Sequence, residues 1–276
     1  MKIGAIIQAR TSSTRLPKKV LKTLPYWSGN TILQHVIHRL RKVKILDTII
    51  VATTIKQEDE AIVAIAHSED IAYFRGSEYD VLGRYYLSAK EHDLDVIVRI
   101  TSDCPCLDAA IVQSLIEKHI SDDADYTSNV LNRTFPHGLD AEVITFAALE
   151  EAHFNASHDY EREHVTPFIY KSNPDHFKIA TLKAPQELYA PHIRLTVDTP
   201  EDYALLCVLF DQGVTTSEGI IDLFKTKPWL HMINGGIAQK KVCSSAEEEI
   251  AEAIRLLSIQ DLPRASSVLS RDRHFI

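Results

Sequence analysis

The stretch KIGAIIQARTSSTRLPKK occupies residues 2–19 and changes character halfway along its length. Residues 2–8 form an apolar run that predicts a first β-strand, and the polar residues that follow predict a loop at its carboxyl end. This loop carries four cations and several hydroxyl groups but no glycine, whereas Walker and Rossmann loops need glycine to bring backbone amides close to phosphate. Arginine and lysine side chains can hold a polyphosphate instead. The loop is therefore a candidate phosphate-binding loop, and a solvated basic loop is the alternative.

Beyond this strand, short apolar runs alternate with amphipathic stretches. The runs that predict further strands are residues 47–54, 71–74, 95–101, 125–129, 176–182 and 193–197. The stretches that predict helices are residues 31–43, 57–68, 79–92, 109–119, 145–156, 159–171, 200–211 and 217–226. This order predicts an α/β fold in which a doubly wound, mostly parallel sheet lies between two layers of helices, as in Rossmann-like folds. In such sheets, ligands bind beyond the carboxyl ends of the strands.

The charge of the chain is unevenly distributed. Residues 1–46 contain ten cations and no Asp or Glu, although the chain of 276 residues has a net charge of −8. A locally basic region on an acidic protein predicts a small polyanionic ligand. A nucleic-acid partner would favour a broad basic face and a basic isoelectric point, whereas the isoelectric point here is about 5.9. We therefore expect no nucleic-acid partner.

The composition also bears on location and on metal chemistry. No apolar run approaches the ~18–20 residues that cross a bilayer, and Arg10 interrupts the first apolar run too early for a secretory signal. We therefore expect a soluble cytoplasmic protein without a membrane partner. The four cysteines form no C-x-x-C pair, and His35 and His38 have no third ligand nearby, so neither a disulfide framework nor a structural zinc site is expected.

Two carboxylates stand at the ends of expected strands. Asp103 follows the run at 95–101, and Asp198 follows the run at 193–197. Two protein carboxylates suit Mg²⁺, which completes its octahedron with phosphate oxygens and water. Asp198 also opens the sequence D-T-P-E-D, which is typical of a helix start, so Thr199 is expected to cap the helix while Asp198 reaches the metal. Asp108 is expected to cap the helix at 109–119.

Two further polar segments lie in the second half of the chain. Residues 137–142 read HGLDAE, and strand-like alternation would place Asp140 and Glu142 together on one face, with an exposed strand as the alternative. Residues 159–167 read DYEREHVTP, and their charge density alone favours a solvated helix face with local ion pairs.

Taken together, these segments resemble the CMP-sugar synthetase superfamily, above all the SpsF-type cytidylyltransferases of spore coat polysaccharide biosynthesis, with the CMP-KDO synthetases as more distant relatives. The segments AIIQARTSSTRLPKKVL, TSDCPCLD and VDTPEDY are similar to the nucleotide-binding and metal-binding motifs of that superfamily, and the resemblance covers about residues 1–230. It implies a fold like that of the nucleotide-diphospho-sugar transferases. FRGSEYDVLGRYY, at residues 74–86, resembles a further segment that lines the nucleotide pocket.

The resemblance implies a role for each matching residue. The implied catalytic residues are Arg10, Arg15, Lys19, Asp103 and Asp198, of which Asp103 and Asp198 hold Mg²⁺. The implied nucleotide-binding residues are Ala9, Arg10, Ser12, Ser13, Arg15, Lys19, Arg75, Asp80, Arg84, Ser102 and Asp103. The implied sugar contacts are His137, Asp140, Glu142, Arg162, Glu163 and His164.

The reaction that this implies is attack by a sugar hydroxyl on the α-phosphorus of CTP, with pyrophosphate leaving. Mg²⁺ would bridge phosphate oxygens and lower the pKa of the attacking hydroxyl. The acceptor is expected to be an acidic sugar, with a nonulosonate ahead of a KDO-like acid. Lys18 stands where the CMP-KDO synthetases prefer glycine, and Thr-Ser-Asp replaces their Gln-Gly-Asp, so the match to KDO itself is weaker.

The extent of the resemblance and the sequence beyond it predict a domain organisation. Residues 1–234 are expected to form a nucleotidylyltransferase domain, with an insertion at about 131–185 for sugar binding and dimerisation, so a homodimer is expected. Residues 235–276 are expected to form a small helical appendage. Within it, Ile250, Ile254 and Leu257 share one helix face, which predicts docking on the body or on a partner subunit.

Two rival functions use a related site. A GT-A glycosyltransferase would bind a nucleotide sugar and a metal, but such enzymes show a D-x-D motif that the Ser102–Cys104 segment lacks. A catalytically silent nucleotide-binding protein of a glycan assembly complex would have no chemical need for Arg15, Lys19, Asp103 and Asp198 together.

Overall fold

A seven-stranded sheet forms the centre of the protein in a computed structural model that describes residues 1–26, 29–238, 243 and 245–271. The strands are β1 (Ile3–Gln8), β2 (Thr48–Thr54), β3 (Ala72–Gly76), β4 (Val96–Thr101), β5 (Tyr126–Ser128), β6 (Glu142–Thr145) and β7 (Ile179–Thr181). Their order across the sheet is β3-β2-β1-β4-β6-β5-β7. Only β6 runs antiparallel to its neighbours, β4 and β5, among the strands of the described residues. The predicted mostly parallel sheet is therefore confirmed.

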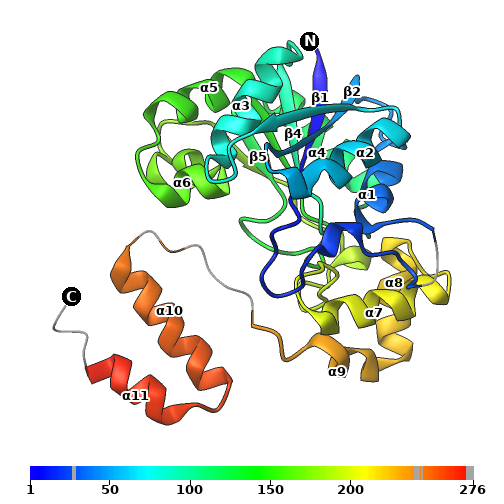
Figure 1. The fold of residues 1–276 in the computed structure, drawn as a ribbon, viewed down its shortest axis with the longest axis vertical. Helices are drawn as coiled ribbons and strands as arrows, with labels where there is room; N and C mark the ends of the chain where they lie inside the picture. The colour runs from blue at the N-terminus through cyan, green and yellow to red at the C-terminus, as the bar shows by residue number, and fades with distance from the viewer. Residues whose placement is uncertain (27–28, 239–242, 244, 272–276) are drawn as a thin grey trace.

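Helices cover both faces of this sheet (Figure 1). The helices of the body are α1 (Ile32–Leu40), α2 (Glu60–Ser68), α3 (Val81–Glu91), α4 (Ala109–Ser121), α5 (Phe146–Asn155), α6 (Asp159–His164), α7 (Pro200–Asp211), α8 (Ser217–Thr226) and α9 (His231–Asn234). Short 3₁₀ turns lie at Lys19–Leu21, Gln57–Asp59, Gln186–Leu188 and Pro228–Leu230, and a π-helical turn lies at Phe168–Ser172.

The two layers of helices follow from the alternation of side chains along the strands. On β1, Ile7 packs in a core with residues of α1, α2 and α4, whereas the adjacent Ile6 packs with residues of α3 and α5 on the opposite face. A third core joins α7 and α8 to the segment that carries Val197. The helix caps that we expected at Asp108 and Thr199 are confirmed, because both side chains accept backbone N–H bonds from their first helical turn.

The predicted strand at 193–197 is wrong. This segment is extended and buried, but its backbone pairs with the loop at 133–139 and with the turn after β4 instead of joining the sheet. His137 N donates to Ile193 O (2.9 Å), Leu195 N donates to His137 O (2.6 Å) and Val197 N donates to Asp103 O (2.8 Å). An apolar run predicts an extended, buried segment equally well whichever partner it has, so the sequence pattern could not distinguish the two.

Two other expectations need correction. The helix expected over 159–171 ends at His164, because Val165 takes a positive φ of 73° and Pro167 lies two residues further on. The chain resumes as the π-helical turn. The alternative of an exposed strand around residue 142 is also wrong. Glu142 begins β6 and is only 4% exposed, since the cationic Arg99 compensates its charge inside the protein.

The C-terminal part contains two helices that pack as a hairpin, and its status as a separate appendage stays a prediction. Its helices are α10 (Ala246–Ile259) and α11 (Pro263–Arg271), which stand apart from the sheet in Figure 1. An ion pair between Lys171 Nζ and Glu248 Oε2 (3.2 Å) connects the hairpin to the body. Residues 239–242, 244 and 272–276 of the expected appendage lie outside the described residues. None of the helices in the part that is described has the length and apolar character to cross a membrane.

Candidate active site

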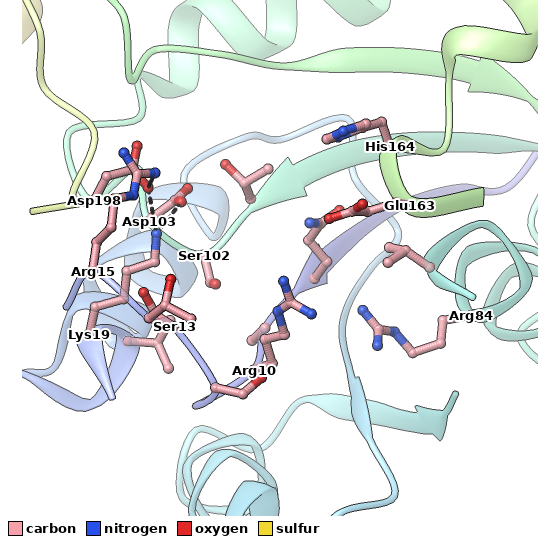
Figure 2. Close-up of a pocket in the computed structure, with 17 residues that line it drawn as sticks. Arg10, Ser13, Arg15, Lys19, Arg84, Ser102, Asp103, Glu163, His164 and Asp198 are labelled. Carbon is pink, nitrogen blue, oxygen red and sulfur yellow. Dashed lines mark hydrogen bonds and ion pairs between the residues drawn. The ribbon is translucent and has the colours of Figure 1, made fainter. Parts of the chain in front are cut away.

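A cavity of about 370 Å³ opens at the carboxyl ends of β1 and β4. Twelve of the residues that the sequence singled out line it, and they come from the loop after β1, the end of β4, α3, α6 and the segment before α7 (Figure 2). These residues are Ala9, Arg10, Ser12, Ser13, Arg15, Lys19, Arg84, Ser102, Asp103, Glu163, His164 and Asp198. The fold thus brings the cationic loop and both strand-end carboxylates to one place.

Lys19 lies between the two carboxylates at one end of the cavity. Its Nζ donates to Asp103 Oδ2 (2.7 Å) and to Asp198 Oδ1 (2.9 Å). Burial lowers the pKa of Lys19, but the two carboxylates outweigh it and raise the pKa above the ordinary value. Burial likewise raises the pKa of Asp103, but the Lys19 ammonium reverses this and holds that pKa well below the usual range. Lys19 and Asp103 are therefore both charged at neutral pH.

Arginine side chains hold Asp198 in place. Arg194 Nη2 donates to Asp198 Oδ2 (2.8 Å), and Arg15 Nη2 lies 3.2 Å from Asp198 Oδ1. Arg194 is in turn fixed by the fully buried Asp202, which accepts from Arg194 Nε (2.8 Å). Asp198 lies outside the hydrogen-bonded strands of the sheet, so this ion-pair network and the helix cap at Thr199 determine its position.

The two carboxylates have the geometry of a small cation site. An oxygen of each already lies within 2.9 Å of one cationic nitrogen, that of Lys19. No group of three or more His, Cys, Asp or Glu side chains in the described part of the chain could hold a metal ion. A site with two carboxylates fits Mg²⁺ together with a polyphosphate, because phosphate oxygens and water then supply the remaining ligands.

Helices α3 and α6 form the other end of the cavity (Figure 2). Arg84 projects from α3, and its Nη1 donates to Ser77 O (2.7 Å). Burial lowers the pKa of Arg84 below the ordinary arginine value. Glu163 and His164 close the same end from α6. This end thus presents one cation, one carboxylate and one imidazole, a set that can bind the polar groups of a second ligand.

Arg75, Asp80 and Arg162 do not line the cavity. Arg75 pairs with Glu60, the first residue of α2. Asp80 caps α3 through Gly83 N (2.9 Å) and also binds Arg162 in a bidentate pair, with Nη2–Oδ2 at 2.7 Å and Nε–Oδ1 at 2.9 Å. This pair connects α3 to α6 and therefore joins two walls of the cavity. A direct ligand contact of these three residues stays a prediction.

His137, Asp140 and Glu142 also lie outside the cavity lining. Arg133 binds Asp140 through two hydrogen bonds of 2.6 and 2.9 Å. Arg194 Nη1 lies 3.2 Å from His137 Nδ1. The Glu142 carboxylate accepts hydrogen bonds from the side chains of Arg99, Tyr126 and Thr166. Each of the three residues thus stabilises a segment beside the cavity, and their contacts with a sugar stay predictions.

The sequence reasoning missed five lining residues, which are Gln8, Thr14, Val20, Val81 and Thr101. Gln8 and Thr101 had a detectable signal, because they are the last residues of the two strands whose carboxyl ends face the ligand site. Val81 follows the expected cap of its helix, and nothing in its residue type marks it as functional.

A mostly parallel α/β sheet with a polyphosphate-sized basic loop and two converging carboxylates at its carboxyl edge defines the nucleotidyltransferase class of enzymes. A profile of the family described as "Cytidylyltransferase" matches residues 4–250. The chain therefore belongs to the cytidylyltransferase family.

Matches that cover nearly the full length of related proteins support this assignment. The chain is 45% identical over 243 residues to an uncharacterized protein of Methanocaldococcus jannaschii, which covers 87% of this chain and 97% of that protein. It is 35% identical over 233 residues to the spore coat polysaccharide biosynthesis protein SpsF of Bacillus subtilis, covering 81% and 94%. The solved structure of a cytidylyltransferase from Leptospira borgpetersenii serovar Hardjo-bovis superposes with a TM-score of 0.77 at 32% identity, covering 83% of this chain and 96% of that one.

Proposed function

We propose that this enzyme transfers CMP from CTP to an acidic sugar and releases pyrophosphate. The observation that carries the proposal is one cavity in which Arg10, Arg15 and Lys19 face the carboxylates Asp103 and Asp198. Cytidine as the base is supported by the family to which the chain belongs. The acidic sugar is supported by the resemblance of the sequence motifs to those of CMP-sugar synthetases.

The loop residues would bind the triphosphate. Arg15 and Lys19 lie beside the carboxylates, and Arg10 and Ser13 extend the polar wall along the loop (Figure 2). Guanidinium and ammonium groups bind phosphate oxygens through charge-assisted hydrogen bonds and offset the charge that builds up on departing pyrophosphate. These side chains therefore orient the α-phosphorus and stabilise the leaving group.

Asp103 and Asp198 would hold Mg²⁺, which when bound neutralises phosphate charge and lowers the pKa of a nearby hydroxyl. For this to happen, the Lys19 ammonium has to move from between the carboxylates toward the phosphates. The side chain of Lys19 is 13% exposed and borders the open cavity, into which it would turn. Arg194 keeps Asp198 oriented while Lys19 moves.

The acceptor would lie against α6. Glu163 and His164 line that end of the cavity and would contact hydroxyl groups of the sugar, and Arg84 from α3 would offset the charge of its carboxylate. In the reaction, a hydroxyl oxygen of the sugar forms a bond to the α-phosphorus, the anhydride bond to the β-phosphate breaks, and the hydroxyl proton leaves to solvent. The products are a CMP-sugar and pyrophosphate.

We propose in addition that the product enters surface or spore-coat polysaccharide synthesis and that the enzyme acts in the cytoplasm as a homodimer. The name of the SpsF relative supports the pathway class. Light scattering coupled to size-exclusion chromatography tests the dimer, and a mass of one chain, 31.1 kDa, would contradict it.

A screen for pyrophosphate release tests the proposed reaction. The enzyme is incubated with CTP, UTP, ATP or GTP and Mg²⁺, and with KDO or a nonulosonate as acceptor. We expect release with CTP and an acidic sugar, and its loss in Asp103→Asn. Asp125→Asn is the matched control, because Asp125 accepts a hydrogen bond from Lys178 N (2.8 Å) at the opposite edge of the sheet. Near-normal release by Asp103→Asn, or nucleoside diphosphate release from a nucleotide sugar as a glycosyltransferase would give, would refute the proposal.

A further inference from the structure

The loop after β1 has no glycine, and contacts with residues outside the loop hold it in shape. One anchor point is Thr11, the third residue after β1, which is only 4% exposed. The carbonyl oxygen of Thr11 accepts from Ser13 N (2.9 Å) and from Lys18 N (3.1 Å), so this one residue closes the loop from both sides. The position of Thr11 therefore determines where the neighbouring Arg10 and Ser12 point.

A buried carboxylate outside the loop holds Thr11. Asp59 lies just before α2 and is 1% exposed. Its Oδ1 accepts from Thr11 N (2.8 Å) and from Thr11 Oγ1 (2.7 Å), and its Oδ2 accepts from Thr54 Oγ1 at the end of β2. Burial of an isolated carboxylate is costly unless hydrogen bonds compensate it, and these three donors are neutral groups.

The side chain of Asp59 does not cap the helix that follows it. It occupies the N-cap position of α2, where aspartate normally accepts a hydrogen bond from the first turn of the helix. Here its side chain makes no such bond and turns to the loop instead. The carboxylate nevertheless remains at the amino end of the helix, where the helix dipole favours a negative charge.

A second carboxylate fixes the residues on both sides of Thr11. Ser12 Oγ donates to Glu78 Oε1 (2.7 Å), and Arg10 Nη1 lies 4.0 Å from the same oxygen. Lys56 pairs with Glu78 and balances its charge. The loop is thus attached to the segments after β2 and β3, beside the strands that frame the cavity, and both attachments act through acidic side chains.

We propose that Asp59 is a positioning residue for the triphosphate: through Thr11, it holds the glycine-free loop in the shape that points Arg10, Ser12 and Ser13 into the cavity. This inference rests on the proposed function in one respect, namely that the loop binds the phosphates of a nucleotide. Since Asp59 acts on the loop and not on the nucleoside, its loss should weaken the binding of CTP far more than the binding of CMP.

The first test compares Asp59→Ala with Asp59→Asn. Isothermal titration calorimetry measures the dissociation constants of CTP and CMP, and differential scanning fluorimetry measures the melting temperature of each variant. We expect Asp59→Ala to raise the dissociation constant of CTP about tenfold or more and that of CMP less than about threefold, because the loss of well-aligned hydrogen bonds misplaces the phosphate ligands. An asparagine oxygen still accepts both Thr11 donors, so Asp59→Asn should remain within about threefold of the wild type for CTP.

The Thr11 side of the contact gives an independent test. Thr11→Val removes the hydroxyl donor and should weaken CTP binding selectively, whereas Thr11→Ser keeps it and should not. Asp125→Ala is the matched control, because it removes a carboxylate that accepts a backbone N–H at the opposite edge of the sheet. It should lower the melting temperature without changing the ratio of CTP to CMP affinity, which separates positioning from a general loss of stability.

Inorganic tripolyphosphate is the probe that separates this inference from the proposed function. If the wild type binds tripolyphosphate and Asp59→Ala binds it about tenfold more weakly, the inference holds even where CTP is not the substrate. Equal losses for CTP and CMP, or an Asp59→Asn variant as impaired as Asp59→Ala, would overturn it. If Asp59→Ala misfolds, the ratio of CTP to CMP affinity in Thr11→Val tests the inference instead.

Discussion

Replacement of Lys19 by methionine tests the central ion-pair cluster. The Lys19 ammonium lies 2.7 Å from Asp103 Oδ2 and 2.9 Å from Asp198 Oδ1, and the three side chains are between 13% and 21% exposed. Removal of one partner from a fully buried ion pair costs ~3–5 kcal/mol because a charge is left uncompensated. Partial exposure reduces this cost, and Asp198 keeps Arg15 and Arg194. We therefore expect Lys19→Met to lower the free energy of unfolding by about 2 kcal/mol.

The assay is urea denaturation of the wild type, Lys19→Met and Lys18→Met, each with and without millimolar Mn²⁺. Lys18 is the matched control because its side chain is exposed on the same loop. In Lys19→Met the carboxylates are free to bind a divalent cation, so Mn²⁺ should restore most of the lost stability by mass action. It should change the wild type and Lys18→Met little, since the ammonium of Lys19 occupies the same position. Equal stabilisation of all three proteins by Mn²⁺ would refute the reasoning.

Three further predictions concern other parts of the structure. Gly138 has a φ of 108°, and a Cβ there would lie 2.6 Å from the backbone of Leu195. Gly138→Ala should therefore lower the free energy of unfolding, measured by urea denaturation, by about 3 kcal/mol and reduce turnover. Gly213→Ala, at a φ of 69° in open space, should lower it by about 1 kcal/mol. Burial lowers the pKa of His119 from 6.5 to about 4, so between these pH values the unfolded chain binds a proton that the folded chain does not. The free energy of unfolding should therefore fall by up to about 3 kcal/mol as the pH falls through that window. His119→Gln should abolish this part of the pH dependence of the free energy of unfolding, and an unchanged pH dependence would contradict the assignment. Arg162→Met should raise the KM for the sugar about tenfold and leave the KM for CTP nearly unchanged, because the Asp80–Arg162 pair positions α6 and not the phosphate loop. A larger effect on the KM for CTP than on that for the sugar would contradict this assignment of the pair to the sugar end of the cavity.

Local patterns were sufficient to predict the part of the site that follows the first and fourth strands. Apolar runs identify β1 and β4, and parallel strands present their carboxyl ends at one edge, so the loop after Gln8 and the carboxylate of Asp103 had to meet there. The motifs added Asp198 correctly to the cavity lining, although the reason we gave for its position, a sheet strand before it, was wrong.

The remainder depends on contacts between distant residues, which local patterns do not contain. Glu142 is buried because Arg99, on another strand, compensates its charge. Asp59 reaches the loop only because β1 and β2 are neighbours in the sheet, and its own sequence context predicts an ordinary helix cap. No pattern in the sequence indicates either pairing, so a structure was required to find them.

The most direct test of the central claim follows the phosphates of CTP. The enzyme is given CTP labelled at the α-phosphate, or in a parallel sample at the γ-phosphate, together with Mg²⁺ and the acidic sugar that gives most pyrophosphate. We predict that the α label appears in a CMP-sugar and the γ label in pyrophosphate, in equal amounts, and that Asp103→Asn loses both. An α label that appears only in free CMP or CDP, or CTP that binds without turnover on any acidic sugar, would contradict the account.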